Sequence, residues 1–98
     1  MDFDTAWGYL RKHTPLSLVT SGGTPFRVDV SDASIAYKSD RDQRRTQSKD
    51  NFELYFRIWF GRGRRDRGSF PNFGTDRSPS ARFRYFSSVF RHLETLSL

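Results

Sequence analysis

The chain has 98 residues, of which 35% are hydrophobic and 16% aromatic, and it carries a net charge of +6 and no cysteine. This length supplies one hydrophobic core, so residues 1–98 are expected to form a single domain, and the absence of cysteine excludes disulfides, thiolate nucleophiles and sulfur-ligated zinc. No apolar run approaches the roughly 20 residues needed to span a membrane, so we expect a cytoplasmic protein without a targeting or anchoring segment.

The first expected element is a short helix that starts at Asp4. Apolar residues recur at helical spacing from Ala6 to Leu10, and the acidic Asp4 suits the first turn. Three basic residues complement the helix dipole in the last turn, namely Arg11, Lys12 and His13. The dipeptide Thr14-Pro15 ends this helix, because proline disfavours helical backbone in the residue before it.

Alternating apolar and polar residues then predict an antiparallel sheet. Residues 16–20 are a short strand candidate, and residues 26–30 and 35–38 alternate with the period of two that is typical of half-buried strands. The latter two segments most simply form a hairpin with a four-residue turn, in which Val30 lies opposite Ile35. After a polar turn at residues 39–43, residues 44–47 are a candidate for a fourth strand at the edge of the sheet.

Two helices are expected after the strands. The first has Ser48 as its N-cap, aromatic residues at helical spacing up to Phe60, and Gly61 at its end. The last has Ser78-Pro79 at its start and an apolar stripe that reaches Leu96. The order of elements predicts an α+β fold with a short N-terminal helix, a three- or four-stranded antiparallel sheet and two helices packed on one face.

A long Arg/Gly-rich loop at residues 61–80 carries the sharpest charge signal. Nine Arg and two Asp lie between Arg57 and Arg91, so this stretch has a charge of +7 while the rest of the chain is close to neutral. Flexible Arg side chains next to aromatic rings grip single strands by phosphate pairing and base stacking. A solvated loop that only aids solubility and a loop that meets an acidic protein stay open as alternatives. The candidate nucleic-acid contacts are Arg62, Arg64, Arg65 and Arg67.

The strand register predicts a second basic surface. Arg27 falls opposite Lys38 in the expected hairpin, and a five-residue turn then places Arg44 beside Lys38 on the outer face of the sheet. Like charges directly opposed destabilise a sheet slightly, so the row of Arg27, Lys38 and Arg44 indicates an anionic partner. The alternative is an exposed face that Asp29 and salt balance.

No catalytic, metal or cofactor site is expected. Asp29 and Lys38 fit part of the hairpin of restriction-type metal nucleases, but Ala36 stands where a second metal-binding carboxylate is needed. His13 and His92 lie near the ends of expected helices, where a cation complements the dipole, and neither has a ligand partner at suitable spacing. Phosphate-binding loops and nucleophile elbows have no counterpart in this sequence. We therefore expect a protein that is not an enzyme.

Five short runs, together with Leu93 and Leu96, carry a resemblance: TPFRVDV at residues 24–30, IAYKS at 35–39, RTQS at 45–48, FE at 52–53 and YFSSVF at 85–90. In these runs the chain resembles small uncharacterised bacterial proteins, including products of mobile gene cassettes. The resemblance implies an α+β fold and no agreed activity, so it transfers no functional residue. The Arg-rich segment at residues 61–68 has no counterpart in it.

These observations favour a non-enzymatic binding module that contacts nucleic acid through the Arg-rich loop. Base-specific contacts are not expected, because no recognition element can be placed in a groove. The alternative is a protein-interaction or homodimerisation domain. The helix expected at residues 48–60 is apolar over more than half of its circumference, which is more than a sheet of short strands covers, and the Arg-rich loop would then face an acidic partner.

Overall fold

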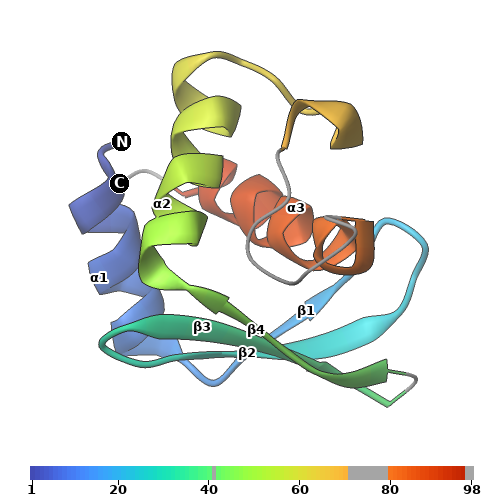
Figure 1. Ribbon diagram of the computed structural model, residues 1–98. Coiled ribbons are helices and arrows are strands. Elements are labelled where there is room, and N and C mark those ends of the chain that lie inside the picture. Colours follow the sequence, from blue (N-terminus) through green and yellow to red (C-terminus); the bar gives the residue numbers. More distant parts are fainter. Residues whose placement is uncertain (41, 71–79, 97–98) are drawn as a thin grey trace.

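Four antiparallel strands form one sheet, and three α-helices lie on the same face of it (Figure 1). The computed structural model describes residues 1–40, 42–70 and 80–96. The elements follow in the order α1 (Phe3–His13), β1 (Leu16–Val19), β2 (Pro25–Val30), β3 (Ser34–Ser39), β4 (Asp42–Ser48), α2 (Lys49–Phe56), the π-helical turn η1 (Arg57–Gly61), the 3-10 turn η2 (Arg67–Ser69) and α3 (Ser80–Glu94). This architecture confirms the predicted α+β fold. None of the helices in these described ranges combines the length and the apolar character needed to cross a bilayer.

Side-chain caps explain where α1 and α2 begin. The Asp2 carboxylate accepts a 2.7 Å hydrogen bond from the backbone N–H of Thr5, and this bond lowers the pKa of Asp2. Ser48 Oγ accepts a 3.1 Å hydrogen bond from the N–H of Asn51, which confirms the predicted N-cap. The predicted start of the last helix at Ser78-Pro79 lies outside the described residues.

The strands pair in the order β1-β2-β3-β4, so the fourth strand that the sequence left open is present. The predicted hairpin register is confirmed, because Val30 lies opposite Ile35 and Arg27 lies opposite Lys38. Phe26, Val28, Ile35 and Tyr37 on the helical face of β2 and β3 are buried, whereas Arg27 and Lys38 are exposed on the other face. The two-residue alternation of these strands therefore sorts apolar side chains inward and charged ones outward.

The turn between β3 and β4 differs from the prediction. Ser39 pairs with Asp42, so two residues rather than five separate these strands. The pairing is shifted between Tyr37 and Ser39, where a β-bulge places one more residue on β4 than on β3. The bulge offsets the shorter turn, so Arg44 is still exposed on the same face as Lys38, as the sequence predicted.

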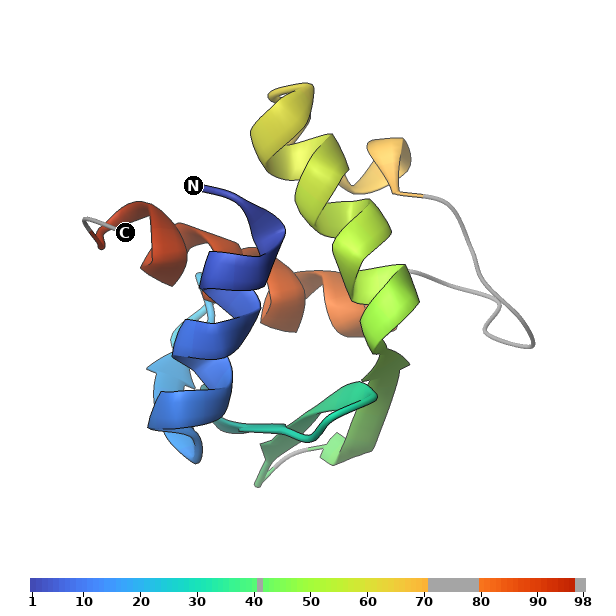
Figure 2. The same cartoon turned by 90° about the vertical axis from the view of Figure 1, so that its left-hand side faces the viewer.

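Aromatic rings build most of the core above the sheet, where the three helices gather (Figure 2). The ring centroid of Phe90 in α3 lies 5.1 Å from that of Phe52 and 5.4 Å from that of Trp59. Phe3 of α1 lies 5.5 Å from Phe56. The aromatic side chains of α2 and η1 are thus buried within one chain, between α1, α3 and the sheet, although their number had indicated self-association.

Two hydrogen bonds between side chains lie on the buried face of the sheet. One joins β3 to β4, and the other joins β3 to α3. The Tyr37 hydroxyl donates to Gln47 Oε1 at 2.8 Å, and burial raises the pKa of Tyr37 well above its ordinary value. The hydroxyls of Ser39 and Tyr85 lie 3.2 Å apart. Buried polar groups that find partners in this way hold the sheet in one position under the helices.

Candidate functional site

The Arg-rich loop leaves α2 through the π-helical turn η1. The N–H of Arg62 donates to the carbonyl of Arg57 at 3.2 Å, and the N–H of Arg64 donates to the carbonyl of Ile58 at 3.1 Å. Gly63 between them has a φ of +68°, in the left-handed region that favours glycine. The backbone of the loop is therefore bonded to the helix over its first turn.

A second anchor holds the far end of the described loop. Ser69 donates from its N–H to the Asp66 carbonyl at 3.0 Å and from its hydroxyl to the Asp66 carboxylate at 2.8 Å. Phe70 follows and is 2% exposed. Its ring lies 5.2 Å from that of Tyr55 and 5.0 Å from that of Phe86. Residues 62–69 thus span two points that are fixed to the core.

The middle of the loop is tied to α3 through Glu94. One carboxylate oxygen of Glu94 accepts a 2.7 Å hydrogen bond from the Trp59 indole N–H, and the other accepts a 2.9 Å ion-pair hydrogen bond from Arg65. The guanidinium carbon of Arg65 lies 5.2 Å from the Trp59 ring centroid, and that of Arg91 lies 5.8 Å from it. Two guanidinium groups therefore converge on one indole, and this single carboxylate balances only one of their two charges.

The four predicted loop arginines divide into two pairs. Arg65 is held by Glu94, and the Arg67 guanidinium lies 5.2 Å from the ring centroid of Phe83, so both side chains also serve to attach the loop. Arg62 and Arg64 are exposed, and neither forms a side-chain hydrogen bond or ion pair within the described part of the chain. All four arginines are exposed, but only this second pair lacks a side-chain contact that holds it to the rest of the described chain.

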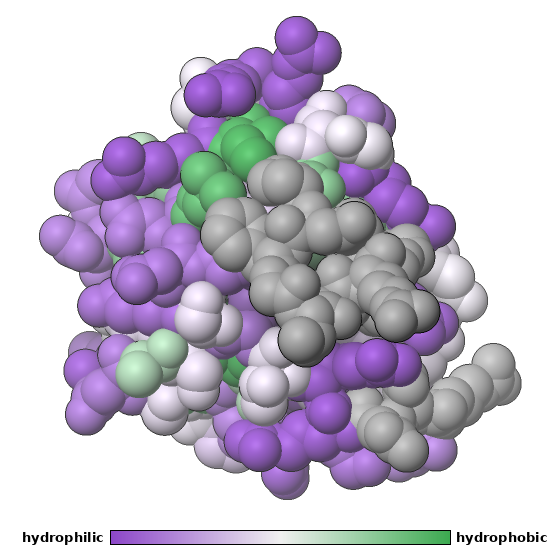
Figure 3. All heavy atoms as spheres, viewed as in Figure 1, coloured by the Kyte–Doolittle hydropathy of each residue, from purple (hydrophilic) through white to green (hydrophobic). Residues whose placement is uncertain are grey.

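A hollow lies beside Arg62, between α2 and the loop. Leu54 and Ile58 form its apolar part, and Arg57 and Arg62 stand at its polar part with Gly68 and Ser69. Arg57 also forms an ion pair of 2.7 Å with Glu53. Figure 3 shows that hydrophobic atoms gather in one patch over the upper part of α2, on a face that is otherwise mostly hydrophilic.

The second predicted surface, formed by Arg27, Lys38 and Arg44, lies on the outer face of the sheet. The Arg27 guanidinium forms an exposed ion pair of 3.2 Å with Asp29. Figure 1 shows the loop above the helices and the sheet below them. The structure brings the three strand residues together, but it places them on the opposite side of the helical layer from the loop. The two surfaces are therefore separate.

The two histidines share a neighbour that the sequence did not predict. Both lie in the last turns of their helices, as expected. The Tyr9 hydroxyl lies 3.4 Å from His92 Nε2, and His13 Nδ1 lies 2.8 Å from the Tyr9 carbonyl oxygen. Burial lowers the pKa of His92. Across the described ranges, no group of three or more His, Asp or Glu side chains is arranged to hold a metal ion.

Sequence reasoning missed Arg91, Trp59 and Glu94 as parts of the basic surface. They come from η1 and α3, and Glu94 meets its partners Trp59 and Arg65 across 35 and 29 residues of sequence. One signal was present, because an acidic residue at a helix C-terminus opposes the helix dipole. Glu94 is the last residue of α3, so its position indicated that it has a cationic partner elsewhere in the fold.

Comparison of the chain with protein-family models, curated proteins and solved structures found no significant match.

Proposed function

We propose that this chain is a non-enzymatic binding module that contacts the phosphate backbone of nucleic acid through its Arg-rich loop. One observation supports the proposal above others: Arg65 and Arg91 both approach the Trp59 ring, where Glu94 pairs with Arg65 alone, while Arg62 and Arg64 in the same loop are exposed without an acid partner among the described residues. Guanidinium groups bind phosphate oxygens through pairs of N–H donors. Several such groups on one short loop and the neighbouring helix suit a chain of phosphates.

The surroundings of the loop favour contact with the backbone rather than the bases. Trp59 and Phe70, two rings that pack against the loop, are 1% and 2% exposed, and Phe83, beside Arg67, is half-buried. Rings that are buried in the core have no free face on which an unstacked base can lie. Binding is therefore expected to be independent of sequence and to weaken steeply with salt, as it does when released counterions dominate the affinity.

The test is a binding titration of the whole chain against a fluorescently labelled duplex of about 20 base pairs and against one of its strands, repeated at several salt concentrations. If Arg62, Arg64, Arg65 and Arg91 each neutralise one phosphate, the logarithm of the duplex affinity falls against the logarithm of salt with a slope of about −3 to −4. An affinity that does not change with salt, or no binding at low salt, contradicts the proposal.

Two variants with the same change in net charge distinguish the contribution of the loop to duplex binding from that of the overall charge of the protein. The double variant Arg62→Gln with Arg64→Gln should weaken duplex binding about tenfold at low salt and reduce the salt slope by about two. The matched control is Arg11→Gln with Lys12→Gln, which removes two exposed charges from α1, and it should bind almost as tightly as the native chain. An equal loss of affinity in both variants means that net charge alone drives binding, and it overturns the assignment to the loop.

A further inference from the structure

The two edge strands of the sheet differ in how well they are protected against pairing with another strand. At the β4 edge, the Arg82 guanidinium of α3 donates a 2.8 Å hydrogen bond to the Thr46 carbonyl, and the strand itself carries Arg44 and Arg45. Charged side chains and bonded edge groups both discourage a further strand. β1, at the opposite edge, has the sequence LSLV and carries no charge.

The ladder between β1 and β2 fixes which residues of β1 are bonded to β2. The N–H of Thr20, directly after β1, donates to the Thr24 carbonyl at 2.9 Å. Hydrogen-bonded residues alternate with residues that are not bonded along an antiparallel pair. The bonded residues of β1 are therefore Leu18 and Leu16, which lie two and four positions before Thr20.

The other two residues of β1, Ser17 and Val19, direct their N–H and C=O groups away from β2. Pro25, which has no N–H to donate, lies opposite Val19, as this register requires. Among the described residues, no hydrogen bond reaches the backbone groups of Ser17 or Val19 on this outer side. The free edge of β1 thus offers two donors and two acceptors with the spacing of a strand.

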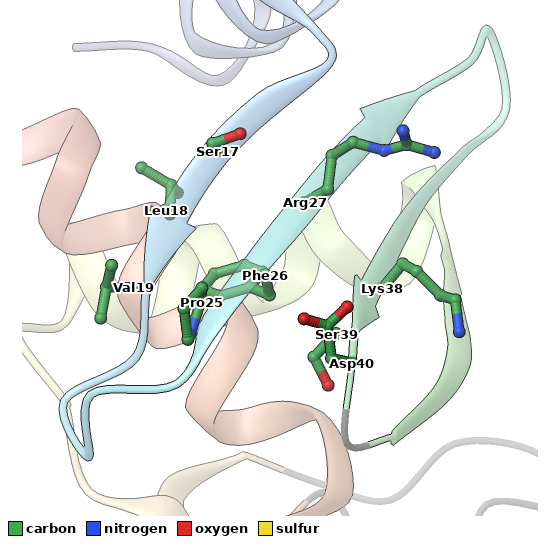
Figure 4. A pocket seen from close by; sticks show the side chains of 9 residues that line it. All are labelled: Ser17, Leu18, Val19, Pro25, Phe26, Arg27, Lys38, Ser39 and Asp40. Atoms are coloured by element: carbon green, nitrogen blue, oxygen red, sulfur yellow. The ribbon is translucent and has the colours of Figure 1, made fainter.

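The side chains of β1 are also incompletely covered. Leu16 and Leu18 face the helices but are only half-buried, whereas Val28, opposite Leu16, is fully buried. On the other face, Val19 is 58% exposed at the end of a shallow hollow that it lines with Pro25 (Figure 4). A strand beside β1 would cover apolar surface on both faces of the sheet.

The position of α3 decides which kind of strand can lie there. Figure 4 shows α3 behind β1, where its C-terminal part continues beyond the edge of the strand, and Figure 2 shows the same end of α3 above β1. Pairing of β1 with β1 of a second copy has a two-fold axis between the two strands. It would bring both α3 helices into the same space. A single extended segment carries no such helix and lies under α3.

Charge favours an acidic segment. The last turn of α1, just before β1, contains Arg11, Lys12 and His13. Arg11 forms an ion pair with Asp32, whereas Lys12 is exposed and has no partner among the described residues. The whole chain has a net charge of +6. Acidic residues that follow a strand antiparallel to β1 would lie at this end of β1.

We propose that the free edge of β1 binds an extended segment of a partner protein, which adds to the sheet as a further antiparallel strand. Ser17 and Val19 each exchange two backbone hydrogen bonds with the residue opposite. The segment has apolar residues opposite Leu18 and Leu16, a β-branched residue opposite Val19, and acidic residues after its last apolar position. This surface is separate from the Arg-rich loop and does not depend on the function proposed above.

The experiment titrates the full-length chain with the peptide acetyl-Val-Ile-Thr-Ile-Glu-Glu-amide and follows the backbone amide signals by NMR. Binding is expected to saturate with a dissociation constant on the order of 0.1–1 mM, as suits a short flexible ligand. The largest shifts should lie at residues 16–20. The amides of Ser17 and Val19 should exchange rapidly with solvent in the chain alone and at least about tenfold more slowly in the complex.

Matched peptides test the register of the added strand. N-methylation of the third residue removes the N–H that points to Ser17 and should weaken binding at least about tenfold. N-methylation of the fourth residue, whose N–H points away from β1, is the control and should change the affinity by less than about twofold. Replacing the two final Glu residues by Lys should weaken binding about fivefold at low salt.

Two variants of the chain test the edge from the other side. Ser17→Pro removes the outward N–H without removing a bond to β2, and proline is tolerated in edge strands. It should weaken peptide binding at least about tenfold. Ser17→Ala keeps the N–H and should bind like the native chain. Urea unfolding shows whether each variant is folded, and hydrogen exchange at Leu18 shows whether β1 still pairs with β2.

The proposal is overturned by equal effects of the two N-methyl groups, by equal binding of Ser17→Pro and Ser17→Ala, or by peptide shifts that do not saturate or lie at β4 or the Arg-rich loop. Protection of Ser17 and Val19 that grows with protein concentration in the chain alone would mean that a second copy occupies the edge. The double variant Arg62→Gln with Arg64→Gln should bind the peptide like the native chain, so failure of this edge and failure of the loop as a nucleic-acid contact are observed separately.

Discussion

The Arg-rich loop and the basic row on the sheet contain the same residue types, but the fold gives them different surroundings. In the loop, the surroundings of each cation depend on tertiary contacts, because Glu94 and Phe83 hold Arg65 and Arg67, whereas Arg62 and Arg64 form no side-chain ion pair among the described residues. On the sheet, strand register alone spaces the cations of the row. A local count of positive charge therefore does not define a binding surface.

The two regions also differ in what lies next to the cations. Beside Arg65 and Arg91 is a buried indole whose N–H is already bonded to Glu94, so this side offers mainly guanidinium groups. Beside Arg27 and Lys38 are a hydroxyl and an exposed apolar strip. The first arrangement supports the proposed contact with repeated phosphates, whereas the second presents its cations beside exposed apolar side chains.

The largest expected effect is on the free energy of unfolding. It separates the loop surface, which packs on the core, from the cations of the sheet, which do not. Trp59→Ala removes a buried ring that packs on Phe90 and supports Arg65, and it should lower the free energy of unfolding by about 3–5 kcal/mol. Lys38→Gln removes an exposed side chain of the sheet row and should change it by less than about 0.5 kcal/mol. Urea unfolding measures both values, and similar values for the two variants would remove the contrast.

A smaller effect on the free energy of unfolding concerns Tyr37, whose side chain is buried on the helical face of β3. Burial raises the folded-state pKa of Tyr37 well above its unfolded value of about 10. The neutral phenol therefore contributes its full stability below about pH 10, and this contribution is lost as the pH rises above that value, at up to about 1.4 kcal/mol per pH unit.

The variant Tyr37→Phe isolates this effect, because other groups that ionise at high pH are common to both proteins. The native chain should be the more stable of the two at pH 8, since the variant leaves Gln47 without its hydrogen-bond donor. Its advantage should shrink when urea unfolding is repeated at pH 11. An advantage that is the same at both pH values means that Tyr37 does not limit the alkaline stability of the sheet.

The smallest expected effect tests whether Glu94 competes with the proposed nucleic acid for Arg65. Glu94→Gln keeps a carbonyl oxygen that can accept the bond from Trp59 but removes the negative charge. Duplex affinity should rise about threefold, because one more guanidinium is available to phosphate. The free energy of unfolding should fall by less than about 1 kcal/mol, since the ion pair is partly exposed. A fall in duplex affinity would show that the carboxylate is needed to position Arg65.

The sheet could be predicted from the sequence in some detail because it follows a local period. The alternation in residues 26–30 and 35–38 predicted which side chains point inward, and it placed Arg27 opposite Lys38. The length of the turn after β3 could not be predicted, because a shorter turn with a bulge puts Arg44 on the same face as the longer turn would. A five-residue turn and a two-residue turn with a bulge are therefore both compatible with the same pattern of side chains.

The loop surface could be predicted only as a concentration of charge. Nothing local in the sequence separates Arg62 from Arg65, since the difference arises when Glu94 of α3 packs beside Trp59. Arg91 was not among the predicted contacts for the same reason, because it lies in α3 and meets Trp59 only in the folded chain. The sequence also did not show that α1 and α3 help the sheet to cover the aromatic rings of α2.

The most direct test of the central claim is an NMR titration that follows the side-chain Nε–H signals of the arginines while a duplex of about 20 base pairs is added. The signals of Arg62, Arg64, Arg65 and Arg91 should shift together at low duplex concentration, and that of Arg27 should shift little, because it lies on the opposite side of the helical layer. Equal shifts at all of these arginines, or shifts at Arg27 without shifts at Arg62 and Arg64, would contradict the claim that the loop side is the phosphate-binding surface.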